Sequence, residues 1–198
     1  MSVLSSRPYG VPTVEAAATA CGVTYGADEK SDVALRLMAD HGRAMSMLVA
    51  DGVLPANEGR GYVLRRVVRR AVLAARRLGV ERSVTPALVG AATEVLGQAY
   101  PALVEHNDVI LSVLEREEAG FDRTLRAGLG RLEEAFATGE KVLGGDVAFT
   151  LHDTHGFPVE LTEELARDAG VAVDRAGFDA AMAAIEMANL MRQLRQAN

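Results

Sequence analysis

The chain has 198 residues, 49% of them hydrophobic, a size and composition that exclude a disordered chain and allow one sizeable core or two small ones. Its single cysteine excludes an internal disulfide, and no apolar stretch is long enough to cross a bilayer or to serve as a signal peptide, so we expect a cytoplasmic protein with no membrane partner. The net charge of −6 argues against unselective nucleic-acid binding but does not say where the charges lie.

The low aromatic content of 5%, together with abundant Ala and Leu, predicts an all-α fold. In the first half of the chain we expect helices over about 13–21, 31–50, 58–79 and 85–99. The second of these carries apolar residues at helical spacing, namely Val33, Leu37, Ala44 and Leu48. The fourth begins with Thr85 and Pro86, a favourable cap and first position. Its predicted inward side comprises Leu88, Val89, Ala92, Val95 and Leu96.

Pro101 separates this half from the next, so we expect two helical subdomains, 1–100 with an Arg-rich helix and 101–198 with the loop HDTHGFP. In the second subdomain, helices are expected over 102–138, as a short helix capped by Asp146, over 158–168 and from about 174 to near the end of the chain. The first of them contains three glycines, each of which costs about 1 kcal/mol relative to Ala and which together favour a kink: Gly120, Gly128 and Gly130.

The helix expected over 58–79 has two faces of different chemistry. At about 100° per residue, six arginines share one arc of about 140°: Arg65, Arg66, Arg69, Arg70, Arg76 and Arg77. The opposite arc is apolar and comprises Leu64, Val67, Val68, Ala71, Val72, Ala75 and Leu78. Arg60 falls on the apolar side of the first turn, where an unpaired charge is costly, so we expect it to pair with a carboxylate or to meet a phosphate instead. Asn57 precedes the helix and is placed to cap it.

Such an arginine face has two interpretations. A charged helix face is most often simply solvated. Here, however, the charges are all of one sign with no Glu at i+4, and 57–82 contains eight Arg against two Glu. Because arginines that neutralise phosphates release counterions, the pattern also fits a nucleic-acid partner. The predicted contacts to the RNA backbone are Arg60, Arg65, Arg66, Arg69, Arg70, Arg76 and Arg77.

Two stretches resemble the alanyl-tRNA synthetase family: ADGVLPANEGRGYVLRR and, further along, FTLHDTHGFPVELT. The segment that leads into the first, TYGADEKSDVALRLMADH, is also similar, so the resemblance covers about 24–178. It implies the helical tRNA-recognition domain of that family, in two subdomains. The family's ATP-binding domain would precede this region and its zinc-containing editing domain would follow it. We therefore expect that this chain does not activate an amino acid with ATP by itself.

In that family, an Asn in the PxNEGRG loop and an Asp in the DTxGFP loop read a G·U pair near the top of the tRNA acceptor stem, which implies base-reading roles for Asn57 and Asp153. The RNA minor groove is shallow, and guanine's amine is the only base donor in it. In a G·U pair that amine is not bonded to the partner base. An Asp accepts from it, and an Asn supplies both donor and acceptor. On the residues alone, Asn57 is a helix cap and Asp153 a turn or cap residue.

Three functions remain open. The chain resembles free-standing proteins of actinomycete secondary metabolism, in which charged tRNA donates an amino acid to a small-molecule nitrogen (sulfonamide, sulfamoyl or amine). This implies an aminoacyl-tRNA-dependent aminoacyltransferase of antibiotic biosynthesis without metal or other cofactor, whose partners are an aminoacylated tRNA and a small acceptor. The second possibility is a non-catalytic tRNA-binding module that acts with a partner enzyme. The third is a fragment of an alanyl-tRNA synthetase, or a helical module that has lost RNA binding.

The geometry of the acceptor stem limits the catalytic candidates. Asn57 and Asp153, at the third base pair, would lie several nucleotides from the charged ribose and are not expected to catalyse transfer. The N-terminal third of the chain offers Tyr25, Asp28, Glu29, Asp40 and His41, of which Tyr25 and His41 are preferred. His155, which replaces an aromatic residue of the family, is the third candidate. Alternatively, His41 is a core or capping histidine and His155 a packing replacement.

Overall fold

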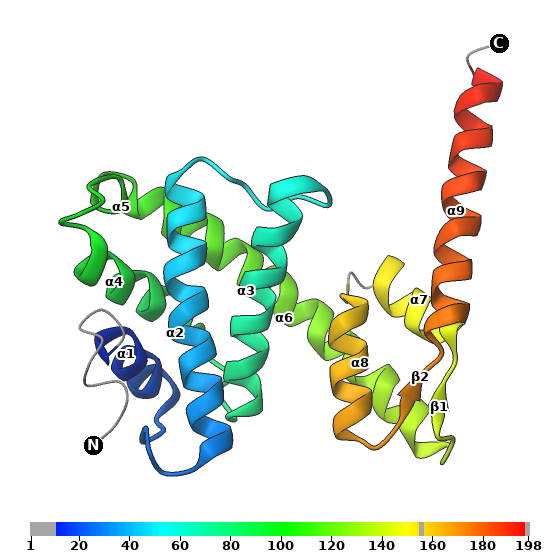
Figure 1. Cartoon of the computed structure of the whole chain (residues 1–198), viewed down its shortest axis with the longest axis horizontal. Helices are drawn as coiled ribbons and strands as arrows, with labels where there is room; N and C mark the ends of the chain where they lie inside the picture. The colour runs from blue at the N-terminus through cyan, green and yellow to red at the C-terminus, as the bar shows by residue number, and fades with distance from the viewer. Residues whose placement is uncertain (1–10, 155–156, 197–198) are drawn as a thin grey trace. The chain divides into compact units, whose positions relative to one another are not determined.

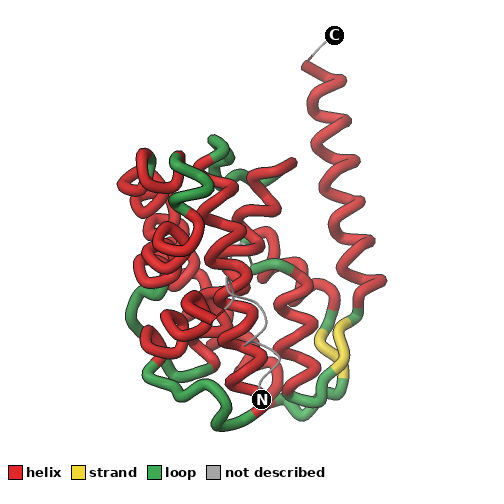
Figure 2. The backbone as a smooth tube through the Cα atoms, turned by 60° about the vertical axis from the view of Figure 1, so that its left-hand side comes forward, coloured by secondary structure: helices red, strands yellow, loops and turns green. Residues whose placement is uncertain are grey.

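The computed structural model describes residues 11–154 and 157–196, and over these ranges it is built almost entirely of helices (Figure 1). The predicted all-α fold is confirmed, and within the described residues two short strands interrupt the helices (Figure 2). The elements are α1 Val11–Cys21, α2 Glu29–Ala50, α3 Gly59–Arg77, α4 Thr85–Leu96, α5 Ala102–Glu105, α6 Asn107–Ala137, β1 Val142–Leu143, α7 Gly145–Asp153, α8 Val159–Asp168, β2 Ala172–Val173 and α9 Arg175–Gln196. None of these helices has the length and apolar character that a membrane crossing needs.

The described residues group into two compact units, which divide between Phe121 and Asp122 within α6. We call them unit 1 and unit 2. The predicted boundary after residue 100 lies elsewhere, at the turn that precedes α5, and it stays a prediction.

In unit 1, α2 is the central helix and packs against α1, α3 and α4. Figure 1 shows α2 and α3 side by side along most of their lengths. The predicted apolar arc of α3 is confirmed, because Leu64, Val68 and Val72 are fully buried. Burial of such side chains, at about 1.5–3 kcal/mol each, supplies much of the stability of the unit. The polar side of α3 is therefore held at a fixed orientation.

The buried side of α2 differs from the one that the sequence suggests. Its buried residues are Leu35, Met38, Ala39, Gly42, Met45, Ser46 and Val49. Val33, by contrast, is 51% exposed, and Ala44 is also exposed. Helical spacing fits more than one stripe on this helix, and the contacts with three neighbouring helices, which are distant in sequence, decide which stripe is buried.

The single helix expected over 102–138 is two helices. α5 ends at its C-cap residue His106, and α6 begins at Asn107. α6 then continues through Gly120, Gly128 and Gly130, so these glycines do not end the helix. Gly128 has a packing role: a Cβ there would lie 2.9 Å from Cδ2 of the buried Phe157.

Unit 2 contains α7, α8, α9 and a two-stranded parallel pair in which Val142 faces Ala172 and Leu143 faces Val173. This short pair was not predicted from the sequence. α7 packs on α8 and α9 around a small core of Ala148, Val159 and Phe178. Gly145, the first residue of α7, allows the closest approach to α9, because a Cβ at this position would lie 2.4 Å from the backbone nitrogen of Phe178.

Candidate nucleic-acid interface

The loop that joins α2 to α3 packs closely against the first turn of α3. Gly61 is buried, and a Cβ there would lie 2.4 Å from the carbonyl oxygen of Leu54 and 2.6 Å from the Cβ of Ala56. Gly59, the first residue of α3, has a φ of +58°, which glycine adopts at little cost. These two glycines of the NEGRG stretch fix the path of the loop and therefore the place of Asn57.

Asn57 has a different role from the helix cap that the sequence suggests. The N-cap position of α3 belongs to Glu58, whose side chain makes no capping hydrogen bond. The side-chain oxygen of Asn57 instead accepts a hydrogen bond from Nη1 of Arg65, two turns along the helix. The capping interpretation is therefore wrong, because the carbonyl group that would cap the helix is engaged by a guanidinium group. The Asn57 residue itself is exposed.

The arginine face of α3 is not a uniform outward surface. Arg69 is only 8% exposed; its Nε donates to Oε1 of Glu117 at 3.0 Å, and its guanidinium group lies 5.3 Å from the centroid of the Phe121 ring. Nε of Arg65 donates to the same Glu117 oxygen at 3.2 Å. Burial lowers the pKa of the Arg69 guanidinium group, and the Glu117 carboxylate opposes that shift. Arg76 pairs with Glu118 at 3.3 Å.

The expectation that six guanidinium groups face outward is therefore wrong for Arg65, Arg69 and Arg76. The neutralising carboxylates come from α6, not from a Glu four residues away on the same helix. The arginines that are exposed are Arg60, Arg66, Arg70 and Arg77. Arg60 was placed on the apolar side of the first turn, but the helix begins at Gly59 and its first turn leaves this side chain in solvent.

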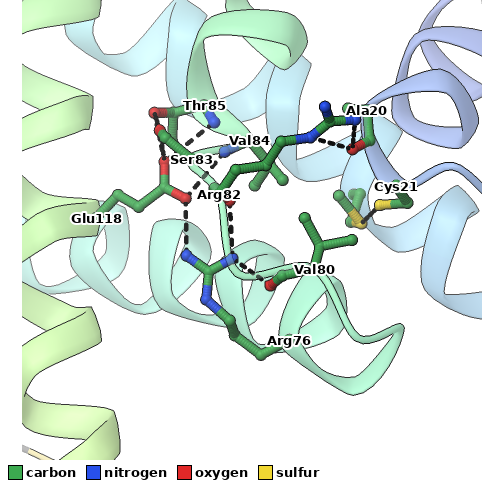
Figure 3. Close-up of polar contacts among 10 residues, drawn as sticks. Ala20, Cys21, Arg76, Val80, Arg82, Ser83, Val84, Thr85 and Glu118 are labelled. Carbon is green, nitrogen blue, oxygen red and sulfur yellow. Dashed lines mark hydrogen bonds and ion pairs between the residues drawn. The ribbon is translucent and has the colours of Figure 1, made fainter.

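Glu118 is a functional part of the scaffold that the sequence reasoning missed. It is 1% exposed and accepts hydrogen bonds from the backbone N–H groups of Val84 and Thr85 at 3.0 and 3.1 Å. The hydroxyls of Ser83 and Thr85 donate to it at 2.5 and 2.6 Å, and Arg76 adds its ion pair (Figure 3). One carboxylate from α6 thus caps the first turn of α4 and orients Arg76.

Arg82, in the loop between α3 and α4, caps the end of α1. Its Nη2 and Nε donate to the carbonyl oxygen of Ala20 at 2.8 and 3.1 Å, at the end of α1 (Figure 3). The carbonyl oxygen of Arg82 accepts in turn from Nη1 of Arg76 at 3.0 Å. A signal for this network is present in the sequence: Glu118 lies in the apolar stripe of Ile110, Leu114, Phe121 and Leu125, where a charge must be paired.

Asp153, the second predicted base reader, is exposed at the last residue of α7 in unit 2. The backbone N–H of the buried Phe157 donates to the carbonyl oxygen of Leu151, in the last turn of α7, at 2.9 Å. The ring of His152 lies edge-on to Phe178, with 5.4 Å between the centroids. These contacts hold the end of α7, and so Asp153, on the core of unit 2. His155 lies outside the described residues.

The remaining catalytic candidates are not assembled into one site. Asp28 is the N-cap of α2, and its hydrogen bond with Ser31 lowers its pKa. Tyr25 lies before this helix, and His41 lies twelve residues beyond its start, about 18 Å along the axis at 1.5 Å per residue. Tyr25 and His41 therefore stay separate candidates rather than one assembled pair. The half-buried position of His41 fits the alternative of a packing histidine.

His41 carries a testable pH dependence. Burial lowers its pKa below the ordinary 6.5, the Arg70 charge adds to this, and Asp40 partly offsets it. Between its lowered pKa and about 6.5, His41 therefore binds more protons in the unfolded state than in the folded state, and the free energy of unfolding should fall as the pH decreases through this window. Urea unfolding at pH 7 and pH 5 should show a smaller difference in His41→Gln than in the parent chain. The exposed His106→Gln serves as the control, and an unchanged pH dependence in His41→Gln would contradict the assignment.

The chain is similar in sequence to known proteins of one family. A family model described as tRNA synthetases class II (A) matches residues 7–196. The alanine–tRNA ligase of Frankia alni is 50% identical over 171 residues, which are 84% of this chain and 19% of the relative. Those of Sphingopyxis alaskensis and Acidithiobacillus ferridurans are 51% and 48% identical over 86% and 87% of the chain. The chain thus spans about a fifth of the length of these relatives.

Proposed function

This chain belongs to the class II (A) tRNA synthetase family and is related to alanine–tRNA ligases, and from that premise we propose that it binds the acceptor stem of an alanine-type tRNA and reads a G·U pair there. The observation that carries the proposal is the Asn57 loop. Gly61 holds this loop against the first turn of α3, whose exposed arginines lie on the same helix. A base-reading side chain and phosphate-binding charges are thus offered by one rigid element of unit 1.

The chemistry of the two readers is complementary. The Asp153 carboxylate is an acceptor, and it would receive a hydrogen bond from the guanine amine that the wobble pair leaves unbonded. The Asn57 amide, in unit 1, would offer a wobble pair both a donor and an acceptor. Short side chains suit this task because the minor groove of an RNA helix is wide and shallow.

The exposed arginines would contact phosphates and set the register without reading sequence. Arg60, Arg66, Arg70 and Arg77 are the residues for this role. Arg69 is excluded from it, because its guanidinium group is buried between Glu117 and Phe121. The positive field is therefore smaller than the sequence suggested, and the net charge of −6 on the chain further limits unselective binding.

The experiment compares two RNA hairpins that copy an acceptor stem and differ only in a G·U or a G·C pair at the third position. Asn57→Ala or Asp153→Ala should reduce the preference for G·U about tenfold or more, as expected for a lost base contact of about 1–3 kcal/mol. Arg66→Ala should weaken both hairpins alike and reduce the slope of log affinity against log salt by about one. Dissociation constants at several salt concentrations measure both effects.

Equal weakening of both hairpins by all three substitutions would argue against base reading by Asn57 and Asp153. An unchanged salt slope in Arg66→Ala would argue against a phosphate contact at that residue. A parent chain that binds an unrelated hairpin equally well would contradict the proposed function as a whole.

We propose further that a bound, charged tRNA serves as aminoacyl donor to a small-molecule nitrogen in natural-product biosynthesis. The supporting observation is a pocket of about 620 Å³ in unit 1, within the usual range for small ligands. It is lined by Asp40, Arg43, Ala44, Met47, Val95, Leu96, Ala99 and Tyr100. The Asp40 carboxylate would take a proton from the acceptor nitrogen as this nitrogen attacks the ester carbonyl carbon. The bond from that carbon to the ribose oxygen would then break, and Asp40 would return the proton to the ribose oxygen, which leaves as a hydroxyl.

Incubation of the protein with alanyl-tRNA and a sulfonamide or amine acceptor tests this activity. The acylated acceptor should form in the parent chain and fall sharply in Asp40→Asn. Product that appears only after a second protein is added would favour the alternative of a non-catalytic module with a partner enzyme. His41 and Tyr25 stay predictions as catalysts, and neither lines the pocket.

A further inference from the structure

Arg65 joins the Asn57 loop to the body of unit 1. Its side chain is 28% exposed and has two acceptors in different elements: Nη1 donates to the Asn57 side-chain oxygen, and Nε donates to Oε1 of Glu117 at 3.2 Å. One guanidinium group thus connects an exposed loop residue to a carboxylate on α6 that is 12% exposed.

The identity of the Arg65 side chain decides which way the Asn57 amide faces. A guanidinium group has only N–H donors and no acceptor, so only the oxygen of the amide can be its partner. The amide nitrogen of Asn57, with its two N–H donors, is therefore turned away from Arg65. Because Asn57 is exposed, these donors are available to an outside acceptor.

Glu117, which accepts from Arg65, is itself held in place. The Glu117 oxygen that Arg65 contacts also accepts from Nε of Arg69 at 3.0 Å. Arg69 is packed over the ring of Phe121, so this second layer belongs to the core of the unit. A planar guanidinium group held at two points loses little further freedom when Asn57 meets a ligand.

We propose that Arg65 is a positioning residue that makes Asn57 a hydrogen-bond donor toward RNA. This inference rests on the proposed tRNA function and deepens it: Asn57 would present donors where Asp153 presents acceptors. The matching acceptors in an RNA minor groove are a purine N3, a pyrimidine O2 or a ribose 2′-hydroxyl. Because a wobble pair moves its pyrimidine relative to a Watson–Crick pair, a donor held at a fixed place distinguishes the two pairs.

The test uses the same G·U and G·C hairpins at one salt concentration. Arg65→Met keeps the aliphatic stem but removes both hydrogen bonds, and it should lower the G·U preference about tenfold. Arg65→Lys, which cannot donate to Asn57 and Glu117 in the same fork geometry, should give an intermediate preference. Arg66→Met is the matched control on the exposed side of the helix, and it should weaken both hairpins without changing their ratio.

Two further variants separate positioning from simple loss of structure. Asn57→Asp keeps an oxygen for Arg65 but has no N–H donors, so it should lose as much G·U preference as Asn57→Ala while its thermal unfolding stays close to that of the parent. In the Asn57→Ala background, Arg65→Met should not change the ratio any further, because its effect is transmitted through Asn57.

The outcomes are distinguishable from those of the proposed function. A parent chain that does not discriminate between the hairpins overturns the proposed function and this inference with it. If the parent chain discriminates between the hairpins but Arg65→Met or Asn57→Asp keeps the parent's ratio of affinities for G·U and G·C, only the inference is overturned. A further loss of the ratio on adding Arg65→Met to Asn57→Ala also overturns it, since Arg65 would then act on the RNA directly.

Discussion

Replacement of Glu118 with Ala is expected to lower the free energy of unfolding of the chain by about 3–5 kcal/mol, the usual cost of removing one partner from a buried ion pair. Arg76 would lose its carboxylate, and the N–H groups of Val84 and Thr85 would lose their acceptors. All of these donors lie at a carboxylate that is 1% exposed, so water cannot readily replace it. Urea unfolding followed by circular dichroism measures the change.

Two variants of α6 define what the Glu118 result means. Glu118→Gln keeps the shape of the side chain but turns an amide N–H group toward donors, so it should also destabilise the chain. Glu115→Ala lies on the exposed side of the same helix and should change the free energy of unfolding by no more than about 0.5 kcal/mol. A Glu118→Ala variant as stable as Glu115→Ala would show that the network in Figure 3 does not hold unit 1 together.

The second large effect is expected for Gly61→Ala. A methyl group at this position would lie 2.4 Å from the Leu54 carbonyl oxygen, which belongs to the backbone and cannot rotate away. The loop or the first turn of α3 must shift, at a cost of about 1–3 kcal/mol for overpacking. Because the shift moves Asn57, the preference for the G·U hairpin should also fall about tenfold. Urea unfolding and hairpin binding measure the two effects.

Gly90→Ala is the matched control for this substitution. Gly90 is an exposed residue inside α4, and a Cβ there meets no atom within 4 Å. The same change of residue should therefore raise the stability by about 0.4–1 kcal/mol, because it restricts the unfolded chain without a clash. If Gly61→Ala behaves like Gly90→Ala, the close contact between the loop and the helix is not what places Asn57.

The sequence predicted α3 well because its two faces follow one helical period over five turns. Leu64, Val68 and Ala71 are buried as that period requires. The same period does not indicate which arginines are neutralised. Arg69 and Arg76 are neutralised by carboxylates 48 and 42 residues away, which no local spacing can reveal.

The base-reading roles of Asn57 and Asp153 stay predictions. The resemblance implied them, and the structure places both residues at exposed positions next to firmly packed segments. The sequence did not indicate what orients Asn57, because the hydrogen bond from Arg65 replaces the helix cap that asparagine usually forms before a helix. The catalytic candidates rested on the expected position of the charged ribose and, for His155, on a departure from the family pattern; Tyr25 lies before α2 and His41 near its middle.

The caps that Arg82 and Glu118 provide have a consequence for how the chain acquires its structure. α1 ends on a side chain 62 residues further along, and α4 begins on one 33 residues further along. Ordinary caps form within a turn of their own helix, whereas these form only after distant segments have met. We therefore expect α1 and α4 to gain full protection from hydrogen exchange together with α6, in one cooperative step, and a polypeptide cut before α6 to leave α4 frayed.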